Sequence, residues 1–346
     1  MTEEPLPESL AAEINTVLDD ADVRTDRRLI MRMMRTAILL GEDDTERLDL
    51  KIASAALAEM RDAFRLFAPF RGVPKVTVFG SARTRQDDPL YLQAREVAAA
   101  LAEDGWMVVT GAGPGIMQAA AEGAGPELSL GVSIRLPFEE KANSLVAGSD
   151  HVVAMKYFFT RKLMLIKESS GFICLPGGFG TLDEMFELLT LQQTGKAEPT
   201  PIVLLDEQGG SFWKGLQRFV DEDLSPTGVI SEGDFDRVVV TDSVDAAVAE
   251  IAGFWRNYDS LRWVGDTLVL RLRGEPTDDE IDDLNHRFGG MLSSGRIERS
   301  APRSPEIADD DVLHLPRLAL HLDQRQVGNL FRLIAAINAL GSAPAT

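Results

Sequence analysis

The chain has 346 residues, of which 45% are hydrophobic and 26% are charged, and its formal net charge is −20. This length is too great for one ordinary core, so we expect a principal domain flanked by smaller modules. The negative charge repels DNA and RNA, and no concentrated basic stripe offsets it, which excludes a nucleic-acid partner. No apolar run approaches the roughly 18 to 20 residues needed to span a bilayer, so no membrane partner is expected.

The N-terminus, the cysteine and the histidines narrow the class further. The first twenty residues are acidic and lack the basic start and apolar centre of a secretory signal, which predicts a cytoplasmic protein. The single cysteine, Cys174, lies in an apolar run and cannot form an intrachain disulfide, so core packing is its expected role. The histidines are scattered without the spacing of a zinc site, and no metal is expected.

Residues 1–72 form the first expected segment. Between residues 8 and 70, apolar side chains such as Leu29, Met33, Leu57 and Phe64 recur at intervals of three and four, which predicts a helical N-terminal cap. Prolines and a glycine between residues 69 and 74 then end the helical pattern.

Residues 73–258 form the second expected segment, in which short apolar strands alternate with helices. This repetition predicts a parallel sheet covered on both faces, a Rossmann-like doubly wound α/β fold. The expected strands are VTVFGSA, MVVTGA, LSLGVSI, HVVAM, FICLPGG, PIVLLD and RVVVTD. Ligands of such sheets bind beyond the carboxyl ends of the strands, and each glycine cluster of the chain lies at one of those ends.

Residues 259–346 form a third segment, for which we expect a small α+β module of order βαββα. Its elements are a strand at 267–272, a helix at 278–292, strands at 296–300 and 317–322, and a helix at 324–340. The intervening loop PRSPEIADDD is polar and contains prolines, so we expect it to be mobile. The pattern assigns no chemistry to this module, and oligomerisation or regulation stays open.

Two glycine clusters follow the first two expected strands. Gly80 permits close backbone approach and Ser81 can donate to a ligand oxygen, although an ordinary strand-to-helix turn explains the pair equally well. Gly111, Gly113 and Gly115 lie between a strand and a helix, where free N–H groups and the helix dipole attract an anion. Their spacing is not the GxGxxG of a dinucleotide site.

The third cluster, Leu175 to Glu184, joins an apolar strand directly to an amphipathic helix. Gly178 and Gly180 let the backbone wrap around a phosphate, and Thr181 offers a hydroxyl and an N–H. Glu184 falls on the first helical turn. By position alone, stabilisation of the helix end is the simpler interpretation of this glutamate.

A pair of cations, Arg161 and Lys162, begins the preceding helix. Adjacent residues on a helix point in different directions, so we expect at most one of the two to face a shared site. Arg161 is the better candidate, because a planar guanidinium binds phosphate or carboxylate through two parallel hydrogen bonds. Surface solvation is the simpler interpretation of Lys162.

Taken together, these residues resemble the LONELY GUY (LOG) family of phosphoribohydrolases, whose hallmark is an arginine–lysine pair followed by PGGxGTxxE. Arg161 with Lys162 and the run from Pro176 to Glu184 match that hallmark in full. The two upstream glycine clusters also match the family's nucleotide-binding pattern, so the resemblance covers about half of the chain. The chain departs from many relatives in the loop Gly111-Ala112-Gly113-Pro114-Gly115, where they carry three consecutive glycines.

The resemblance implies hydrolysis of the N-glycosidic bond of a nucleoside 5′-monophosphate, of the AMP or cytokinin riboside monophosphate type, to a free base and ribose 5-phosphate. It implies catalytic roles for Arg161 and Glu184. It also implies a set of residues around the substrate and its phosphate, namely Gly80, Ser81, Gly111, Gly113, Gly115, Met117, Met155, Lys162, Gly177, Gly178, Gly180 and Thr181.

The resemblance further implies a homo-oligomer, at least a dimer, with sites near a subunit interface. Some relatives are labelled lysine decarboxylases, but no pyridoxal phosphate site is recognisable, and no cofactor is expected. The alternative is a non-catalytic protein on the same fold that binds or carries a nucleotide or the molybdenum cofactor, because fold alone does not fix function.

Overall fold

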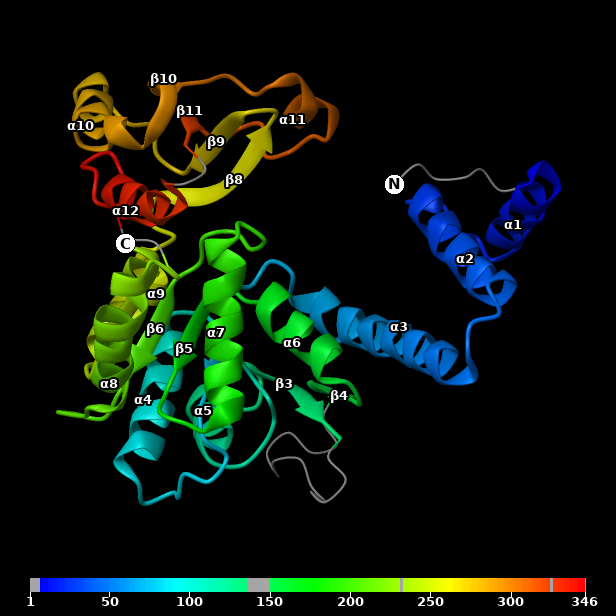
Figure 1. The fold of residues 1–346 in the computed structure, drawn as a ribbon, viewed down its shortest axis with the longest axis horizontal. Helices are drawn as coiled ribbons and strands as arrows, with labels where there is room; N and C mark the ends of the chain where they lie inside the picture. The colour runs from blue at the N-terminus through cyan, green and yellow to red at the C-terminus, as the bar shows by residue number, and fades with distance from the viewer. Residues whose placement is uncertain (1–6, 136–149, 231–232, 324–325, 346) are drawn as a thin grey trace. The chain divides into compact units, whose positions relative to one another are not determined.

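The computed structural model of the chain describes residues 7–135, 150–230, 233–323 and 326–345. Its contacts divide the chain into two compact units, Met1–Arg61 and Asp62–Thr346. Figure 1 shows the elements of both units coloured along the chain. The boundaries expected at residues 72 and 258 stay predictions.

The first unit is helical, as the apolar periodicity predicts. It contains α1 (Glu8–Asp20), α2 (Arg27–Glu42) and the first part of α3 (Arg47–Phe67). Ile14 and Leu18 of α1 are buried, and an ion pair of 2.7 Å between Arg27 and Asp19 joins α1 to α2. The helix α2 itself has no buried residue.

The second unit contains a seven-stranded sheet of order β4-β3-β2-β1-β5-β6-β7 in which every paired strand is parallel. The chain first builds outward from β1 to β4 and then returns to the other side of β1 with β5. The Rossmann-like doubly wound fold is therefore confirmed. The strands are β1 (Lys75–Phe79), β2 (Met107–Thr110), β3 (Ser129–Ile134), β4 (Val152–Met155), β5 (Gly171–Cys174), β6 (Ile202–Leu205) and β7 (Val238–Thr241).

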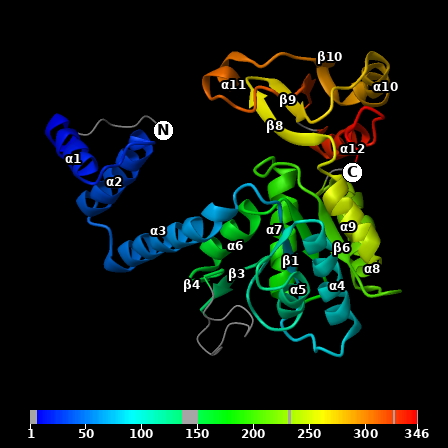
Figure 2. The same cartoon turned by 180° about the vertical axis from the view of Figure 1, so that it is seen from behind.

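Helices cover both faces of this sheet (Figures 1 and 2). They are α4 (Pro89–Glu103), α5 (Ile116–Ala124), α6 (Phe158–Lys167), α7 (Phe179–Gln193), α8 (Phe212–Phe219) and α9 (Val244–Gly253). On one face, α4, α5 and α9 pack with Val76 and Val78 of β1 in one core cluster. On the other face, Thr77 of β1 donates to the carbonyl of Leu165 in α6, and Trp213 of α8 donates to that of Leu205 in β6. Central strands are consequently buried on both sides, which accounts for their continuous apolar sequences.

The C-terminal module is an antiparallel sheet of order β10-β11-β9-β8 with three helices. Its elements are β8 (Tyr258–Val264), β9 (Thr267–Leu272), α10 (Asp278–Phe288), β10 (Leu292–Arg299), α11 (Ser304–Ala308), β11 (Arg317–Leu322) and α12 (Val327–Asn338). The expected α+β character is confirmed, but the βαββα order lacks β8 and α11. The expected helix also ends earlier, at Phe288, because β10 already begins at Leu292.

The segment PRSPEIADDD differs from the expected loop. It contains α11, and the carboxylate of Glu306 is fully buried between the guanidinium groups of Arg271 and Arg317, at 2.9 and 3.2 Å. Burial acts to raise the pKa of Glu306, but hydrogen bonds from the backbone N–H of Arg303 and from the two guanidinium groups lower it, so the carboxylate is charged and paired. The prediction of an irregular loop is therefore wrong for Ser304–Ala308. Among the described residues, no helix has the length and apolarity to cross a membrane.

Candidate functional site

Three loops meet where the sheet reverses its winding, beyond the carboxyl ends of β1, β2 and β5. Phe79 and Cys174, the last residues of β1 and β5, are register partners. The next residue, Leu175, donates from its backbone N–H to the carbonyl of Phe79 at 2.9 Å, and Ile116 donates to the carbonyl of Ser81 at 3.0 Å. The loops are thereby fixed to one another at the position where doubly wound sheets bind their ligands.

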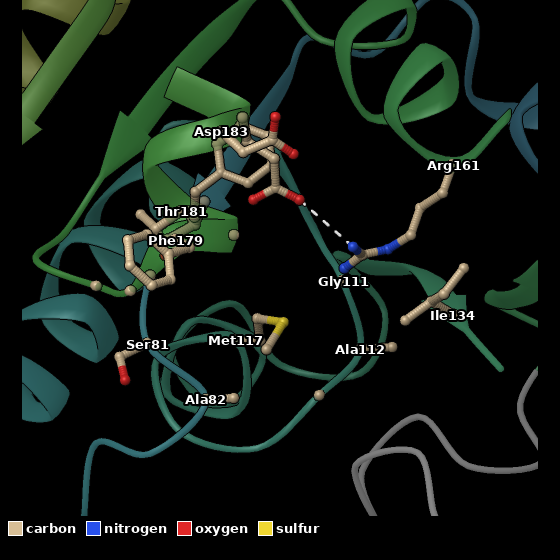
Figure 3. A pocket seen from close by; sticks show the side chains of 18 of the residues that line it. Ser81, Ala82, Gly111, Ala112, Met117, Ile134, Arg161, Phe179, Thr181 and Asp183 are labelled. Atoms are coloured by element: carbon tan, nitrogen blue, oxygen red, sulfur yellow. Dashed lines mark hydrogen bonds and ion pairs between the residues drawn. The ribbon is translucent and has the colours of Figure 1, made fainter. Parts of the chain in front are cut away.

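The loops surround an open pocket of about 980 Å³. Most of the predicted site residues line it, namely Gly80, Ser81, Gly111, Gly113, Met117, Arg161, Lys162, Gly177, Gly178, Gly180, Thr181 and Glu184. Figure 3 shows Ser81, Phe179 and Thr181 on one side of Met117, and Ile134 and Arg161 on the other. This size suits a small organic ligand such as a nucleotide.

Gly115 and Met155 do not line this pocket. Gly115 has φ +68°, and a Cβ at this position would lie 2.3 Å from the carbonyl oxygen of Ser81. Its role is to let the loop after β2 pack against the loop after β1. Met155 is fully buried at the end of β4.

Arg161 and Glu184 face each other across the pocket from α6 and α7. A guanidinium N–H of Arg161 lies 3.4 Å from a carboxylate oxygen of Glu184, the contact drawn as a dashed line in Figure 3. The Nε of Arg161 donates to the carbonyl of Val132 in β3 at 3.0 Å, which fixes the guanidinium plane. Only 11% of the Arg161 side chain and 13% of the Glu184 side chain are exposed. The pair is therefore largely desolvated but still reachable from the pocket.

The environment of Glu184 makes it a titratable group near neutrality. Burial raises the pKa of this carboxyl to about 7, and the positive charges of Arg161 and Lys162 oppose the shift. Desolvation therefore outweighs the two cations. A carboxylate whose pKa lies near the operating pH is suited to general acid–base work, and such a shift in a cleft marks a candidate catalytic residue.

Lys162 also lines the pocket, so the expectation that only one cation of the pair could face the site is wrong. Its ammonium group makes ion pairs with Asp183 at 2.7 Å and Glu187 at 3.0 Å, both on α7. The Cα–Cβ bonds of Lys162 and Arg161 point in different directions on α6, but a lysine side chain is long enough to reach α7. Lys162 thus joins α6 to α7 beside the Arg161–Glu184 pair.

Glycine occupies the positions of the site for different physical reasons. A Cβ on Gly111 would lie 2.0 Å from the guanidinium of Arg161, so this glycine makes room for the arginine. A Cβ on Gly178 or Gly180 would meet no atom within 4 Å, so packing within the chain does not require glycine at either position. Ala112 has φ +56°, a conformation that glycine adopts at lower cost.

Several pocket residues carry no motif and were not predicted. Arg83 lies in the loop after β1, Ser133 and Ile134 end β3, and Arg135 follows it. Phe158 and Phe212 line the pocket from α6 and α8. The position of Arg83 and Arg135 just after strand ends was the available signal, because side chains there converge in a doubly wound sheet.

Gly80 and Gly178 offer a matched pair of substitutions. A Cβ on Gly80 would lie 2.5 Å from the branched side chain of Ile116, so Gly80→Ala should lower the free energy of unfolding by about 1 to 3 kcal/mol through overpacking. Gly178→Ala meets open space at an extended φ of −85° and should change it by less than about 0.5 kcal/mol. Urea denaturation of both variants without ligand measures this. Equal stabilities would contradict the packing role of Gly80.

Fold and pocket together define a Rossmann-like α/β protein whose glycine-rich loops and arginine–glutamate pair share one ligand site. A family model described as possible lysine decarboxylase matches residues 114–251. A cytokinin riboside 5′-monophosphate phosphoribohydrolase of Mycobacterium tuberculosis is 33% identical over 181 residues, which cover 51% of this chain and 92% of that relative. A protein of the same name from Mycobacterium marinum is 32% identical with the same coverage. The chain belongs to the LOG family.

Solved structures show a likeness to about half of the chain. The molybdenum cofactor binding protein of Rippkaea orientalis is similar over 52% of this chain and 96% of its own, with 21% identity and a TM-score of 0.38. At this TM-score nothing about activity follows from the likeness.

Proposed function

We propose that the site hydrolyses the N-glycosidic bond of a nucleoside 5′-monophosphate, of the AMP or cytokinin riboside monophosphate type, to a free base and ribose 5-phosphate. The observation that carries this proposal is the buried Glu184, with a pKa raised to about 7, paired with Arg161 beside an open glycine loop. The names of the mycobacterial relatives support the reaction class.

The N-terminus of α7 is the proposed phosphate site. Gly178 and Gly180 leave open space above the backbone, and Thr181 follows within the first turn. The free N–H groups and the positive end of the helix dipole attract an anion there. Glu184 lies further along the same helix, so phosphate bound at its start would hold the ribose near this carboxylate and turn remote binding energy into positioning.

Glu184 is the proposed catalytic base. The C1′–N bond breaks with its electron pair leaving on the base, and positive charge develops on the ribose, where a carboxylate stabilises it. The oxygen of a water molecule then bonds to C1′, and Glu184 takes the proton that the water releases. The departing base takes up a proton from the solvent. Arg161 orients the Glu184 carboxylate and keeps its pKa from rising above the neutral range.

The proposal is tested by incubating the protein with AMP, GMP, CMP, UMP and an isopentenyl-AMP and separating the products by chromatography. We expect free base and ribose 5-phosphate in equal amounts from at least one nucleotide. Tight nucleotide binding by the folded protein without any base release would favour the alternative, a nucleotide or molybdenum-cofactor carrier.

We further propose that the protein is a homo-oligomer, at least a dimer. Phe158, Phe159 and Leu163 of α6 are between 46% and 54% exposed, which is unusual for three large apolar side chains on one helix. Light scattering on the protein as it elutes from a size-exclusion column gives the mass of the particle in solution. A monomer at micromolar concentration would overturn this proposal.

A further inference from the structure

The pocket is lined by more positive charge than its carboxylates neutralise. Four cationic side chains line it: Arg83, Arg135, Arg161 and Lys162. Glu184 compensates Arg161, and Asp183 with Glu187 compensates Lys162. Neither Arg161 nor Lys162 is thus available at full charge to an anionic ligand.

The two remaining arginines differ in their place relative to the α7 N-terminus. Among the described residues, neither Arg83 nor Arg135 makes an ion pair, and the Arg135 guanidinium has only a 3.5 Å contact with the carbonyl of Ala154. Arg83 belongs to the loop after β1, the neighbour of β5, whose loop leads into α7. Arg135 follows β3, which is separated from β1 by β2. Strands lie about 4.8 Å apart, so Arg135 starts roughly two strand spacings further from the phosphate loop.

The loop that carries Arg83 is fixed next to the glycine loop. The backbone N–H of Arg83 donates to the hydroxyl oxygen of Ser81 at 3.1 Å, and a Cβ on Gly177 would lie 3.1 Å from the backbone nitrogen of Ser81. Arg83 therefore lies in a turn that contacts the glycine loop before α7, at Gly177. Its exposed side chain lines the same pocket.

We propose that Arg83 binds the 5′-phosphate and is the residue by which the site distinguishes a nucleoside monophosphate from a nucleoside. The inference rests on the proposed function for the identity of the substrate. Backbone N–H groups and a helix dipole supply only partial charges, whereas a phosphate monoester carries nearly two negative charges at neutral pH. A guanidinium supplies a full charge and two parallel hydrogen bonds to phosphate oxygens.

The test compares Arg83→Ala and Arg83→Lys with the matched control Arg85→Ala. Arg85 lies two residues further along the chain, is exposed, and pairs with Asp87 at 3.0 Å outside the pocket. Arg83→Ala should lower kcat/KM for AMP by roughly 10 to 100-fold, the loss typical of one charge-assisted hydrogen-bonding partner. The kcat/KM for adenosine should not change. Arg83→Lys should recover part of the loss, and Arg85→Ala should behave as the wild type.

A binding measurement tests the role of Arg83 without relying on the hydrolysis reaction. Calorimetric titration with ribose 5-phosphate and with ribose should show that Arg83→Ala weakens binding of the phosphate ester only. The wild-type affinity should also fall more steeply with added salt than that of Arg83→Ala, because an exposed ion pair is screened. If Arg83→Ala hydrolyses AMP and its ratio of kcat/KM for AMP to kcat/KM for adenosine equals that of the wild type, the role of Arg83 is overturned and the proposed function stands. Binding that depends on Arg83 but is not followed by hydrolysis would support the role of Arg83 and overturn the proposed function. No binding to the wild type would overturn the role of Arg83 and the proposed function together.

Discussion

Glu184→Gln is expected to lower kcat by about 10³-fold, equivalent to about 4 kcal/mol of transition-state stabilisation, because an amide neither accepts a proton from water nor carries negative charge. The amide keeps the size of the carboxylate and can still accept a hydrogen bond from Arg161. Substrate binding should therefore change little. Loss of base release with retained nucleotide affinity is the expected result, and unchanged kcat would remove Glu184 from the mechanism.

The pH dependence of the rate tests the role of Glu184 independently. Because burial raises the pKa of Glu184 to about 7, the rate should rise with pH through that value as the carboxyl loses its proton. This limb should be absent from the residual activity of Glu184→Gln. A wild-type profile that is flat between pH 5 and 8 would contradict the assignment.

The same shift makes Glu184 a source of instability at neutral pH. Its folded pKa of about 7 lies above the ordinary 4.5, so the folded state holds the proton more tightly than the unfolded state does. The stability that this provides is fully present below about pH 4.5 and is lost as the pH rises through 7. Relative to the wild type, Glu184→Gln should gain up to about 3 kcal/mol of unfolding free energy between pH 5 and 8. Denaturant titrations at both values measure this difference.

Arg161→Ala is expected to lower kcat/KM by at least about 10²-fold at pH 7 and to move the ascending limb of the pH profile to higher pH. The substitution removes the nearest positive charge from Glu184, so the pKa of that carboxyl should rise further. It also leaves the carbonyl of Val132 without the donor it has at 3.0 Å. Activity should consequently recover in part above pH 8.

Three further measurements test how Arg161 acts on Glu184. Arg161→Lys keeps the charge and should shift the limb less than Arg161→Ala. Guanidinium ion at millimolar concentration should restore some activity to Arg161→Ala, because the substitution leaves space for it beside Gly111. The double variant with Glu184→Gln should be little worse than the single variants, since residues that act as a unit are not additive. Additive losses would show that Arg161 and Glu184 act separately.

The strands and glycine loops of the sheet were predictable because their signals are local. Buried parallel strands produce continuous apolar runs, and each run of the central domain became a strand. The elements that were missed have weak local signals. The strand β8 lies at a sheet edge with mostly half-buried side chains, so it lacks a continuous apolar run. The helix α11 is short and is held by Glu306 between arginines of β9 and β11, and nothing in its own polar sequence shows that contact.

Within the site, the motif predicted which residues meet but not what they do to one another. The Arg161–Lys162 pair and Glu184 were matched from sequence, and the structure places all three at one pocket. The burial that raises the pKa of Glu184, and the ion pairs of Lys162 with Asp183 and Glu187, depend on where the fold places α6 and α7. Arg83 belongs to no motif, and its position after a strand end was the one sequence signal that pointed to the pocket.

The position of the pocket at the reversal of the sheet has a thermodynamic consequence. Its walls come from both halves of the winding, from the loops after β1 and β2 on one side and the loop after β5 on the other. A ligand that touches both halves binds the folded chain and not the unfolded one, and a concentration of 100 times Kd raises the unfolding free energy by about 2.7 kcal/mol. The melting temperature therefore reports occupancy without any chemistry. Heating the Glu184→Gln protein with one nucleotide after another ranks the bases it accepts, even those it would otherwise have consumed.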